Sequence, residues 1–142
     1  MSRSPFVNLP VADLARATAF REAPGAARDP RVCSDAAAGL SLDGAIHVMP
    51  LPPEHSAGFS LRPVADPRAA TAVLHCLARD SRGAVDDTLA RAVAASGRTG
   101  PRLVQAHAII HGRSVEDADG PVREPTGMET AAFADAPGAS HV

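Results

Sequence analysis

The sequence predicts an α+β chain in which a strand, a helix and further strands occur twice in the same order. A short apolar segment at 6–11 precedes a helix-forming segment at 14–23. The second half repeats this order, with an apolar, β-branched segment at 71–78 and then a helix that ends at Ser96-Gly97. Short strand-like runs bounded by Gly, Pro and Asp follow each helix and supply the remaining strands.

The first half is predicted to hold one helix and one hairpin. Asp13 can cap the helix, and Pro24-Gly25 ends it. The apolar residues of this helix share one face: Leu14, Ala17 and Phe20. A turn at Asp43-Gly44 predicts a hairpin over 40–49. The intervening segment reads as a loop with a short strand at 31–33.

The second half is predicted to end in strands. Its helix begins after a cap at Asp80 or Ser81. Residues 103–111 are expected to form one strand, which would place His107, Ile109 and His111 on the same face. An acidic turn at 116–120 joins short strands on either side, and 134–142 is expected to be a disordered tail.

Composition limits the function classes. The chain has 142 residues and a formal charge of −2, which gives no support for nucleic-acid binding. No segment has the roughly 20 apolar residues of a membrane helix, and the first residues lack a signal-peptide pattern, so we expect a soluble, cytoplasmic protein. Cys33 and Cys76 are expected to be reduced.

The predicted core is thin. The sequence has 30 Ala but 10 Leu, 12 Val, 3 Ile and 4 Phe, and a buried Ala removes less apolar surface from water than a Leu or Phe. We therefore expect a partner surface, most simply a homodimer.

Four stretches give the chain a resemblance to a known family. These are 6–14 with Ala19-Phe20, 46–49, 80–97, and 111–120 followed by Glu124. In this order they resemble the vicinal oxygen chelate superfamily of glyoxalases, bleomycin-resistance proteins and extradiol dioxygenases. The resemblance implies one glyoxalase-like domain over 1–135. Two βαβββ modules, at 1–53 and 54–133, would form an open, curved mixed sheet around a cleft.

The resemblance also implies a metal site with four positions, two from each module. Carried over to this chain, they fall on Phe6 (or Asn8, on the same face), His47, Leu74 and Glu124. Only His47 and Glu124 can donate to a metal, whereas catalytic sites generally have about three protein ligands. The expectation is thus no strong metal centre, with at most a weakly held divalent ion. Pro125 directly after Glu124 predicts a short or distorted closing strand.

Each candidate residue has an alternative interpretation. His47 is either a ligand or acid–base group or a hydrogen-bonded strand histidine, and Glu124 is either a ligand or a surface carboxylate paired with an arginine. His111 and Arg113 are candidate substrate contacts, although Arg113 can instead pair with Glu116 or Asp117. The spacing of His107 and His111 matches a zinc hydrolase helix, but the intervening residues lack its Glu.

Three functions remain open from sequence alone. The first is a glyoxalase/bleomycin-resistance-like protein that binds a small molecule in the cleft, with catalysis doubtful. The second is a divalent-metal-dependent lyase or ring-cleaving dioxygenase that uses His47 and Glu124. The third is a degenerate, non-catalytic interaction module. No nucleotide-binding, flavin-binding or serine-nucleophile motif occurs in the sequence.

Overall fold

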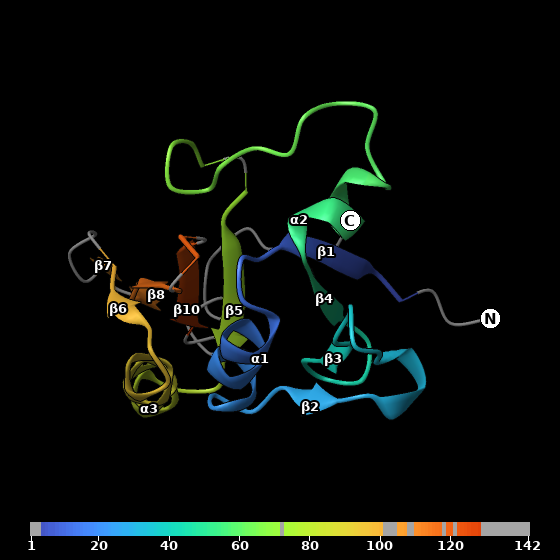
Figure 1. Ribbon diagram of the computed structural model, residues 1–142. Coiled ribbons are helices and arrows are strands. Elements are labelled where there is room, and N and C mark those ends of the chain that lie inside the picture. The colour runs from blue at the N-terminus through green and yellow to red at the C-terminus, as the bar shows by residue number, and fades with distance from the viewer. Residues whose placement is uncertain are drawn as a thin grey trace, which may run out of the picture.

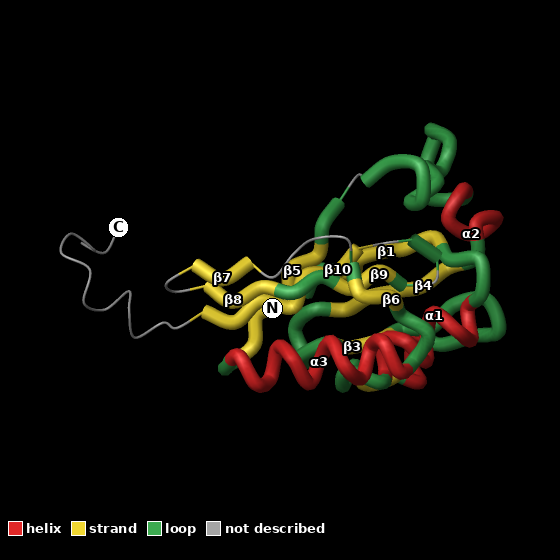
Figure 2. Tube along the Cα trace, turned by 90° about the vertical axis from the view of Figure 1, so that its left-hand side faces the viewer, coloured by secondary structure: helices red, strands yellow, loops and turns green. Residues whose placement is uncertain are grey.

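The strands form two open, mixed sheets that lie side by side (Figure 1). The computed structural model describes residues 4–71, 73–100, 105–107, 110–117, 119–120 and 122–128. Helices α1 (Leu14–Glu22) and α3 (Arg82–Ala94) lie on one side of the strands (Figure 2). Helix α2 (Pro53–Ala57) and the segment that follows it lie on the other side. We call these two sides the helix side and the open face.

The first sheet comes from the first half of the chain. Its strands are β1 (Phe6–Pro10), β2 (Ala27–Arg28), β3 (Leu40–Ser41) and β4 (His47–Leu51), in the order β1-β4-β3-β2. β1 and β4 pair in parallel, and β3 and β4 form the predicted antiparallel hairpin. The Asp43 carboxylate fixes its turn by accepting hydrogen bonds from the backbone N–H groups of Ala45 and Ile46.

The second sheet is built around its last strand. The strands are β5 (His75–Arg79), β6 (Arg98–Thr99), β7 (Gln105–His107), β8 (Ile110–Gly112), β9 (Val115–Glu116) and β10 (Val122–Met128). β5 pairs in parallel with one edge of β10, while β8 and β9 pair with the other edge. In each half the first and last strands thus pair in parallel, and a helix follows the first strand in the sequence. This arrangement confirms the predicted fold.

Side-chain caps explain where the two long helices begin. The Asp13 carboxylate accepts a hydrogen bond from the Arg16 backbone N–H at 2.9 Å, as predicted. For α3 the cap is Ser81 rather than Asp80, since the Ser81 hydroxyl accepts from the Ala84 N–H at 3.1 Å. Each cap satisfies one N–H that the first helical turn leaves unpaired.

Two sequence-based expectations about strands are wrong. The segment at 31–33 lies in a short 3-10 helix (Pro30–Val32), because Pro30 is suited to the first helical position and Asp29 caps it. Residues 103–111 do not form one strand. β7 and β8 instead pair antiparallel, with Ala106 opposite His111 and His107 opposite Ile110, so His107 and His111 are not successive residues of one strand face.

The closing strand is also longer than predicted. β10 runs through Pro125 for seven residues. The Pro125 carbonyl accepts from the Arg113 N–H, and Arg113 lies in the gap between β8 and β9. Proline has no N–H to donate to a neighbouring strand. Pro125 faces the break between β8 and β9, where no ladder hydrogen bond is needed, so β10 itself stays continuous.

A small apolar cluster joins the two halves on the helix side. Phe20 of α1 packs with Leu89 and Ala92 of α3 and with Val115 of β9. Phe20 is 2% exposed, and full burial of such a side chain contributes roughly 1.5–3 kcal/mol. Within the described ranges, no helix is both long and apolar enough to cross a lipid bilayer.

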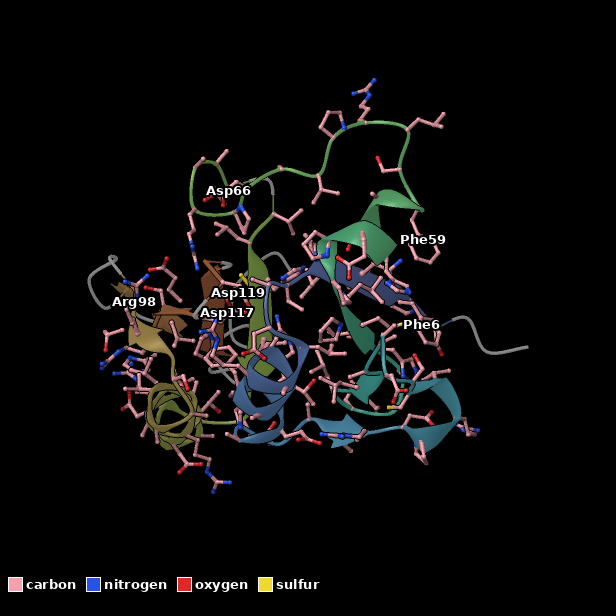
Figure 3. The ribbon with its side chains drawn as sticks, in the orientation of Figure 1. Phe6, Phe59, Asp66, Arg98, Asp117 and Asp119 are labelled. Atoms are coloured by element: carbon pink, nitrogen blue, oxygen red, sulfur yellow. The ribbon has the colours of Figure 1, made fainter. Side chains whose placement is uncertain are left out.

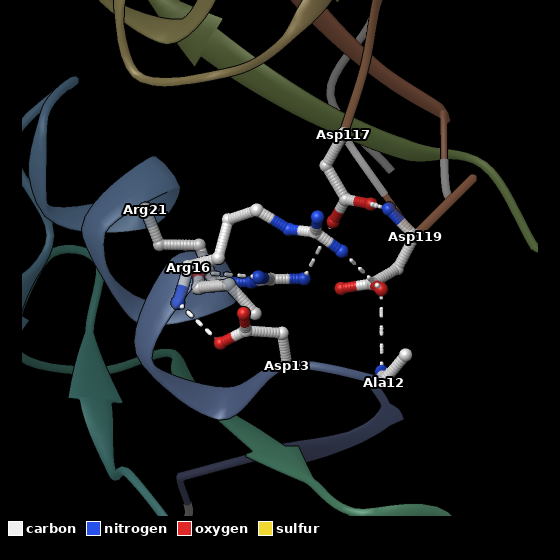
Figure 4. Close-up of polar contacts among 7 residues, drawn as sticks. Ala12, Asp13, Arg16, Arg21, Asp117 and Asp119 are labelled. Atoms are coloured by element: carbon white, nitrogen blue, oxygen red, sulfur yellow. Dashed lines mark hydrogen bonds and ion pairs between the residues drawn. The ribbon is translucent and has the colours of Figure 1, made fainter.

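A buried ion pair adds a polar joint beside this cluster (Figure 4). Arg21 Nη2 lies 3.0 Å from Asp117 Oδ2, and the two side chains are 1% and 0% exposed. Burial lowers the pKa of the Arg21 guanidinium, whereas the Asp117 carboxylate opposes that shift. Asp119 accepts from the Ala12 backbone N–H and from Arg16, both at 3.2 Å. We call these contacts the helix-side joint.

Candidate functional site

Phe6 and His47 lie together on the open face of the first sheet. They are directly paired in the β1–β4 register and therefore point to the same side, together with Asn8. The alternate residues, Leu9 and Val48, point to the opposite side and are buried. Figure 3 shows Phe6 on the first sheet, apart from Asp117 and Asp119. The first two predicted metal positions are thus brought into contact.

The contact between these residues is a ring stack. The Phe6 ring and the His47 imidazole have centroids 4.6 Å apart and planes 11° apart. Phe6 is still 48% exposed, so the stack forms part of the surface. The Nδ1 atom of His47 is buried and has no hydrogen-bond partner among the residues that the structure describes. The imidazole is therefore held by an apolar ring and not by a hydrogen bond at Nδ1.

The second sheet presents the corresponding pair of positions. In the β5–β10 register Cys76 lies opposite Glu124, as Phe6 lies opposite His47 in the first sheet. A Cβ on Gly127, three residues after Glu124, would approach Val85 of α3 at 3.2 Å, so Gly127 faces the helix side. By strand alternation the backbone positions of Glu124 and Cys76 face the other way, toward the open face.

The register therefore changes one predicted position. Leu74 was carried over as the partner of Glu124, but the residue that pairs with Glu124 is Cys76. Leu74 precedes β5, lies two residues from Cys76, and is 42% exposed. Strand alternation does not distinguish Leu74 from Cys76, because residues two apart share a face, so only the pairing register identifies Cys76.

His111 and Arg113 lie together, but on the helix side. His111 pairs with Gly127 across β8 and β10 and therefore faces α3. Both side chains approach the same carboxylate oxygen of Asp86 in α3, His111 Nε2 at 3.4 Å and Arg113 Nη1 at 3.4 Å. The Asp86 carboxylate thus contacts both of the side chains that are candidate substrate contacts. Neither residue joins His47 on the open face.

The register places Cys76, a third possible donor, with His47 and Glu124 at these positions, but the described side chains do not converge on a divalent metal. Phe6 has no lone pair, and its ring covers one face of the His47 imidazole. Within the described part of the chain, no three His, Cys, Asp or Glu side chains converge closely enough to hold an ion. A catalytic divalent site generally has about three protein ligands. We therefore derive no chemistry through a metal at His47 and Glu124.

Two carboxylates near His47 are ionised at neutral pH. Hydrogen bonds from the Arg31 side chain and backbone lower the pKa of Asp29 to about 2, and the nearby His47 imidazole adds a smaller effect. Backbone hydrogen bonds from Ala45 and Ile46 lower the pKa of Asp43. The Arg31 guanidinium offsets the charge of Asp29, so Asp43 is the carboxylate of this pair whose charge backbone N–H groups stabilise.

A cleft of about 290 Å³ lies at the seam between the two halves. Its walls come from β1 (Asn8 and Pro10), from the linking segment between α2 and β5 (Val64 and Val73), from the first residue of β5 (His75) and from the turn before β10 (Gly120). The linking segment lies on the open-face side of the strands (Figure 2). We call this space the seam cleft. Its walls are mainly apolar, and Asn8 adds an amide that can both donate and accept hydrogen bonds.

Sequence reasoning anticipated only part of this cleft. Asn8 was named as a residue on the Phe6 face, but Val64, Val73 and Gly120 were not singled out. Gly120 has a φ of +104°, and a Cβ there would meet the Arg68 side chain at 2.8 Å. The sequence feature that indicates this part of the cleft is therefore the glycine at the end of the acidic turn.

Solved structures share this fold. A glyoxalase/bleomycin resistance protein/dioxygenase family enzyme from Burkholderia phytofirmans PsJN superposes with a TM-score of 0.71 at 18% identity, over 87% of this chain and 96% of that chain. The fosfomycin resistance protein FosX from Listeria monocytogenes gives 0.61 at 19% identity, over 89% and 93%. A lactoylglutathione lyase from Agrobacterium tumefaciens gives 0.61 at 19% identity, over 89% and 94%.

The sequence itself matches no protein-family model and has no significant match among curated proteins. The structural matches nevertheless cover most of both chains. The protein therefore has the vicinal oxygen chelate fold, which confirms the predicted resemblance at the level of the fold.

Proposed function

We propose that this protein binds a small, largely apolar molecule in the seam cleft and that it does so without metal-dependent catalysis. The observation that carries the proposal is the cleft itself, which lies between the two halves and has apolar walls with one amide. Its volume of about 290 Å³ is near the lower end of the roughly 300–1,000 Å³ of ligand pockets. The structural relatives include a fosfomycin resistance protein. Binding without turnover agrees with the poor donor set at Phe6 and His47.

A matched pair of arginine substitutions tests this proposal. Val73→Arg places a charged side chain in the cleft, whereas Val93→Arg places the same side chain on α3, outside it. Both valines are exposed, at 59% and 38%, so both variants should fold. Bleomycin and catechol are suitable first compounds for thermal-shift screening and titration calorimetry.

The wild type and Val93→Arg should bind the active compound equally, while Val73→Arg should bind it at least tenfold more weakly. Equal binding by both variants would place the ligand elsewhere and overturn the proposal. Failure of the whole screen with a folded wild type would favour the interaction-module alternative.

We further propose that any divalent ion at His47 and Glu124 is weakly held. Purified protein should contain much less than one equivalent of Mn, Fe, Ni or Zn, and these ions should leave its melting temperature unchanged. A stoichiometric ion that is lost in His47→Ala would instead establish the lyase or dioxygenase alternative.

The proposal includes a homodimer and a cytoplasmic location. Several large apolar side chains are exposed, among them Phe59 at 73% and Leu61, which follow α2 (Figure 3). A second copy would cover such side chains. Sedimentation equilibrium should detect the dimer, and Leu61→Asp should weaken it. Cys33 and Cys76 form no disulfide, in keeping with a reducing compartment. The module limits of 1–53 and 54–133 remain part of this proposal.

A further inference from the structure

A second cavity, of about 360 Å³, lies on the helix side and shares no lining residue with the seam cleft. It is bounded by α1, α3, the strand β5 and the tip of the β3–β4 hairpin. Its apolar walls include Phe20, Leu42, Ile46, Leu77, Ala92 and Val115. The volume is within the range of small-molecule sites. Phe6 and His47 are not among the described residues that line this cavity, whereas Cys76 is.

Two arginines give the cavity its polar character. Arg21 and Arg79 both line it, and each has a buried Nε atom without a hydrogen-bond partner in the described part of the chain. The Arg21 side chain is 1% exposed. A buried N–H group in a folded protein is almost always satisfied by some acceptor. The unpaired Nε–H groups leave these two arginines with unused donor capacity at the cavity wall.

The two arginines differ in their charge balance. Arg21 is neutralised by Asp117, 3.0 Å away. Arg79 donates from Nη2 to the carbonyl of Pro24 at 3.1 Å, which carries no formal charge. None of the carboxylates described in the structure forms an ion pair with Arg79. A guanidinium keeps its charge under all ordinary conditions, so Arg79 offers the cavity a positive charge that no direct ion pair with a described carboxylate neutralises.

The mouth of the cavity adds a second electrostatic constraint. Asp43 also lines the cavity, at the hairpin tip, and its carboxylate accepts from the N–H groups of Ala45 and Ile46. A ligand with a single carboxylate can approach Arg79 and place its apolar part against the walls. A second carboxylate would lie in the apolar interior or near Asp43, and either position is unfavourable.

We propose that this cavity binds a small apolar monocarboxylate, whose carboxylate accepts hydrogen bonds from Arg79. The inference is independent of the function proposed for the seam cleft. Arginine suits this task because its planar guanidinium can offer two parallel N–H groups to one carboxylate.

The test uses octanoate as the probe, with octan-1-ol as its neutral counterpart and suberate as the dicarboxylate of equal length. Titration calorimetry on the full chain should show saturable binding of octanoate, at least tenfold tighter than octan-1-ol or suberate. Arg79→Met should reduce octanoate affinity at least tenfold, whereas Arg91→Met, on the exposed side of α3, should not. Equal affinities for octanoate and octan-1-ol, or no saturable binding to folded wild type, would overturn the proposal.

A second pair of variants protects the test against misfolding of Arg79→Met. Ile46 lines the cavity and is 39% exposed, so both Ile46→Gln and Ile46→Glu should be tolerated. The two side chains differ mainly in charge. Ile46→Glu should bind octanoate several-fold more weakly than Ile46→Gln, and equal binding would contradict the proposed position of the carboxylate. Val73→Arg should leave octanoate affinity unchanged, and a loss there would move the probe to the seam cleft and overturn this inference.

Discussion

The helix-side joint and the open face use polar side chains in opposite ways. At the joint, Arg21 and Asp117 are buried and paired, and Asp119 accepts hydrogen bonds from the first half of the chain. On the open face, the positions that correspond to metal ligands hold a stacked Phe6 and His47, half-exposed and with an unpaired Nδ1. The buried charged groups of the helix-side joint therefore connect the two halves, whereas Phe6 and His47 on the open face offer one donor between them.

This contrast teaches that the fold does not depend on the metal positions. The parallel pairs β1–β4 and β5–β10 form with full register, with Phe6 opposite His47 in the first pair and Cys76 opposite Glu124 in the second. Backbone hydrogen bonds, helix caps and the Phe20 cluster suffice to set this geometry. Stability and site chemistry should consequently respond to different substitutions.

The largest effect is expected at the joint. Arg21→Met leaves the Asp117 carboxylate buried without its partner, and such a loss generally costs about 3–5 kcal/mol. Urea unfolding should show this decrease in the free energy of unfolding. Arg21→Met combined with Asp117→Asn should recover part of it, because the unpaired charge is gone. A cost below about 1 kcal/mol for Arg21→Met alone would mean that the pair does not hold the halves together.

A gain of metal binding should follow from one substitution on the open face. Phe6→His places a second imidazole beside His47, where the two ring centroids are 4.6 Å apart in the wild type. Nickel should then raise the melting temperature of the variant but not of the wild type. At a nickel concentration about 100 times the Kd, the expected stabilisation is about 2.7 kcal/mol. Equal shifts in both proteins would show that Phe6 is not what weakens the site.

A much smaller effect is expected for His47→Phe. The new ring can keep the stack with Phe6, and no hydrogen bond at Nδ1 is lost. The free energy of unfolding should change by less than about 0.5 kcal/mol. A loss of more than 1.5 kcal/mol would indicate a polar contact that the stack does not explain.

The smallest effect concerns acid stability at Asp29. The pKa of Asp29 is about 2 in the folded chain, against an ordinary value of 3.8, chiefly because of hydrogen bonds from Arg31. A carboxylate with a lowered pKa stabilises the fold above its unfolded pKa, and this contribution is lost as the pH falls toward the folded pKa. Urea midpoints between pH 4 and pH 2 should therefore fall more steeply for the wild type than for Asp29→Asn. Parallel curves would contradict this assignment.

Local signals in the sequence predicted much of the fold. Asp13 marked the first helix, Ser81 was one of two named caps for the second, and Asp43-Gly44 marked the hairpin. The sequence does not predict the antiparallel pairing of β7 with β8, because the segment 103–111 is largely apolar and contains no Gly, Pro, Asn or Asp. The effect of Pro125 on its strand was predicted wrongly. The destabilisation that a strand proline causes depends on which backbone group lies opposite its nitrogen, and the tertiary structure determines that group.

The candidate site was less predictable than the fold. His47 and Phe6 were placed in one site from the resemblance, and their register brings them into contact. Cys76 was missed in favour of Leu74, since a shift of two residues along a strand preserves the face but changes the partner. The pairing of His111 and Arg113 with Asp86 depends on how α3 packs on the second sheet, and spacing alone does not encode that packing. The expected tail at 134–142 lies outside the described residues.

The buried position of Asp117 also has a kinetic consequence. Domain swapping, in which two copies of this chain exchange halves, would first require Arg21 to separate from Asp117. Both side chains are buried, so breaking the pair raises the activation barrier to domain swapping of folded chains. Association of intact chains avoids that barrier. A dimer of intact chains should thus return quickly to its monomer–dimer equilibrium on dilution. A domain-swapped dimer would have to form during synthesis or refolding.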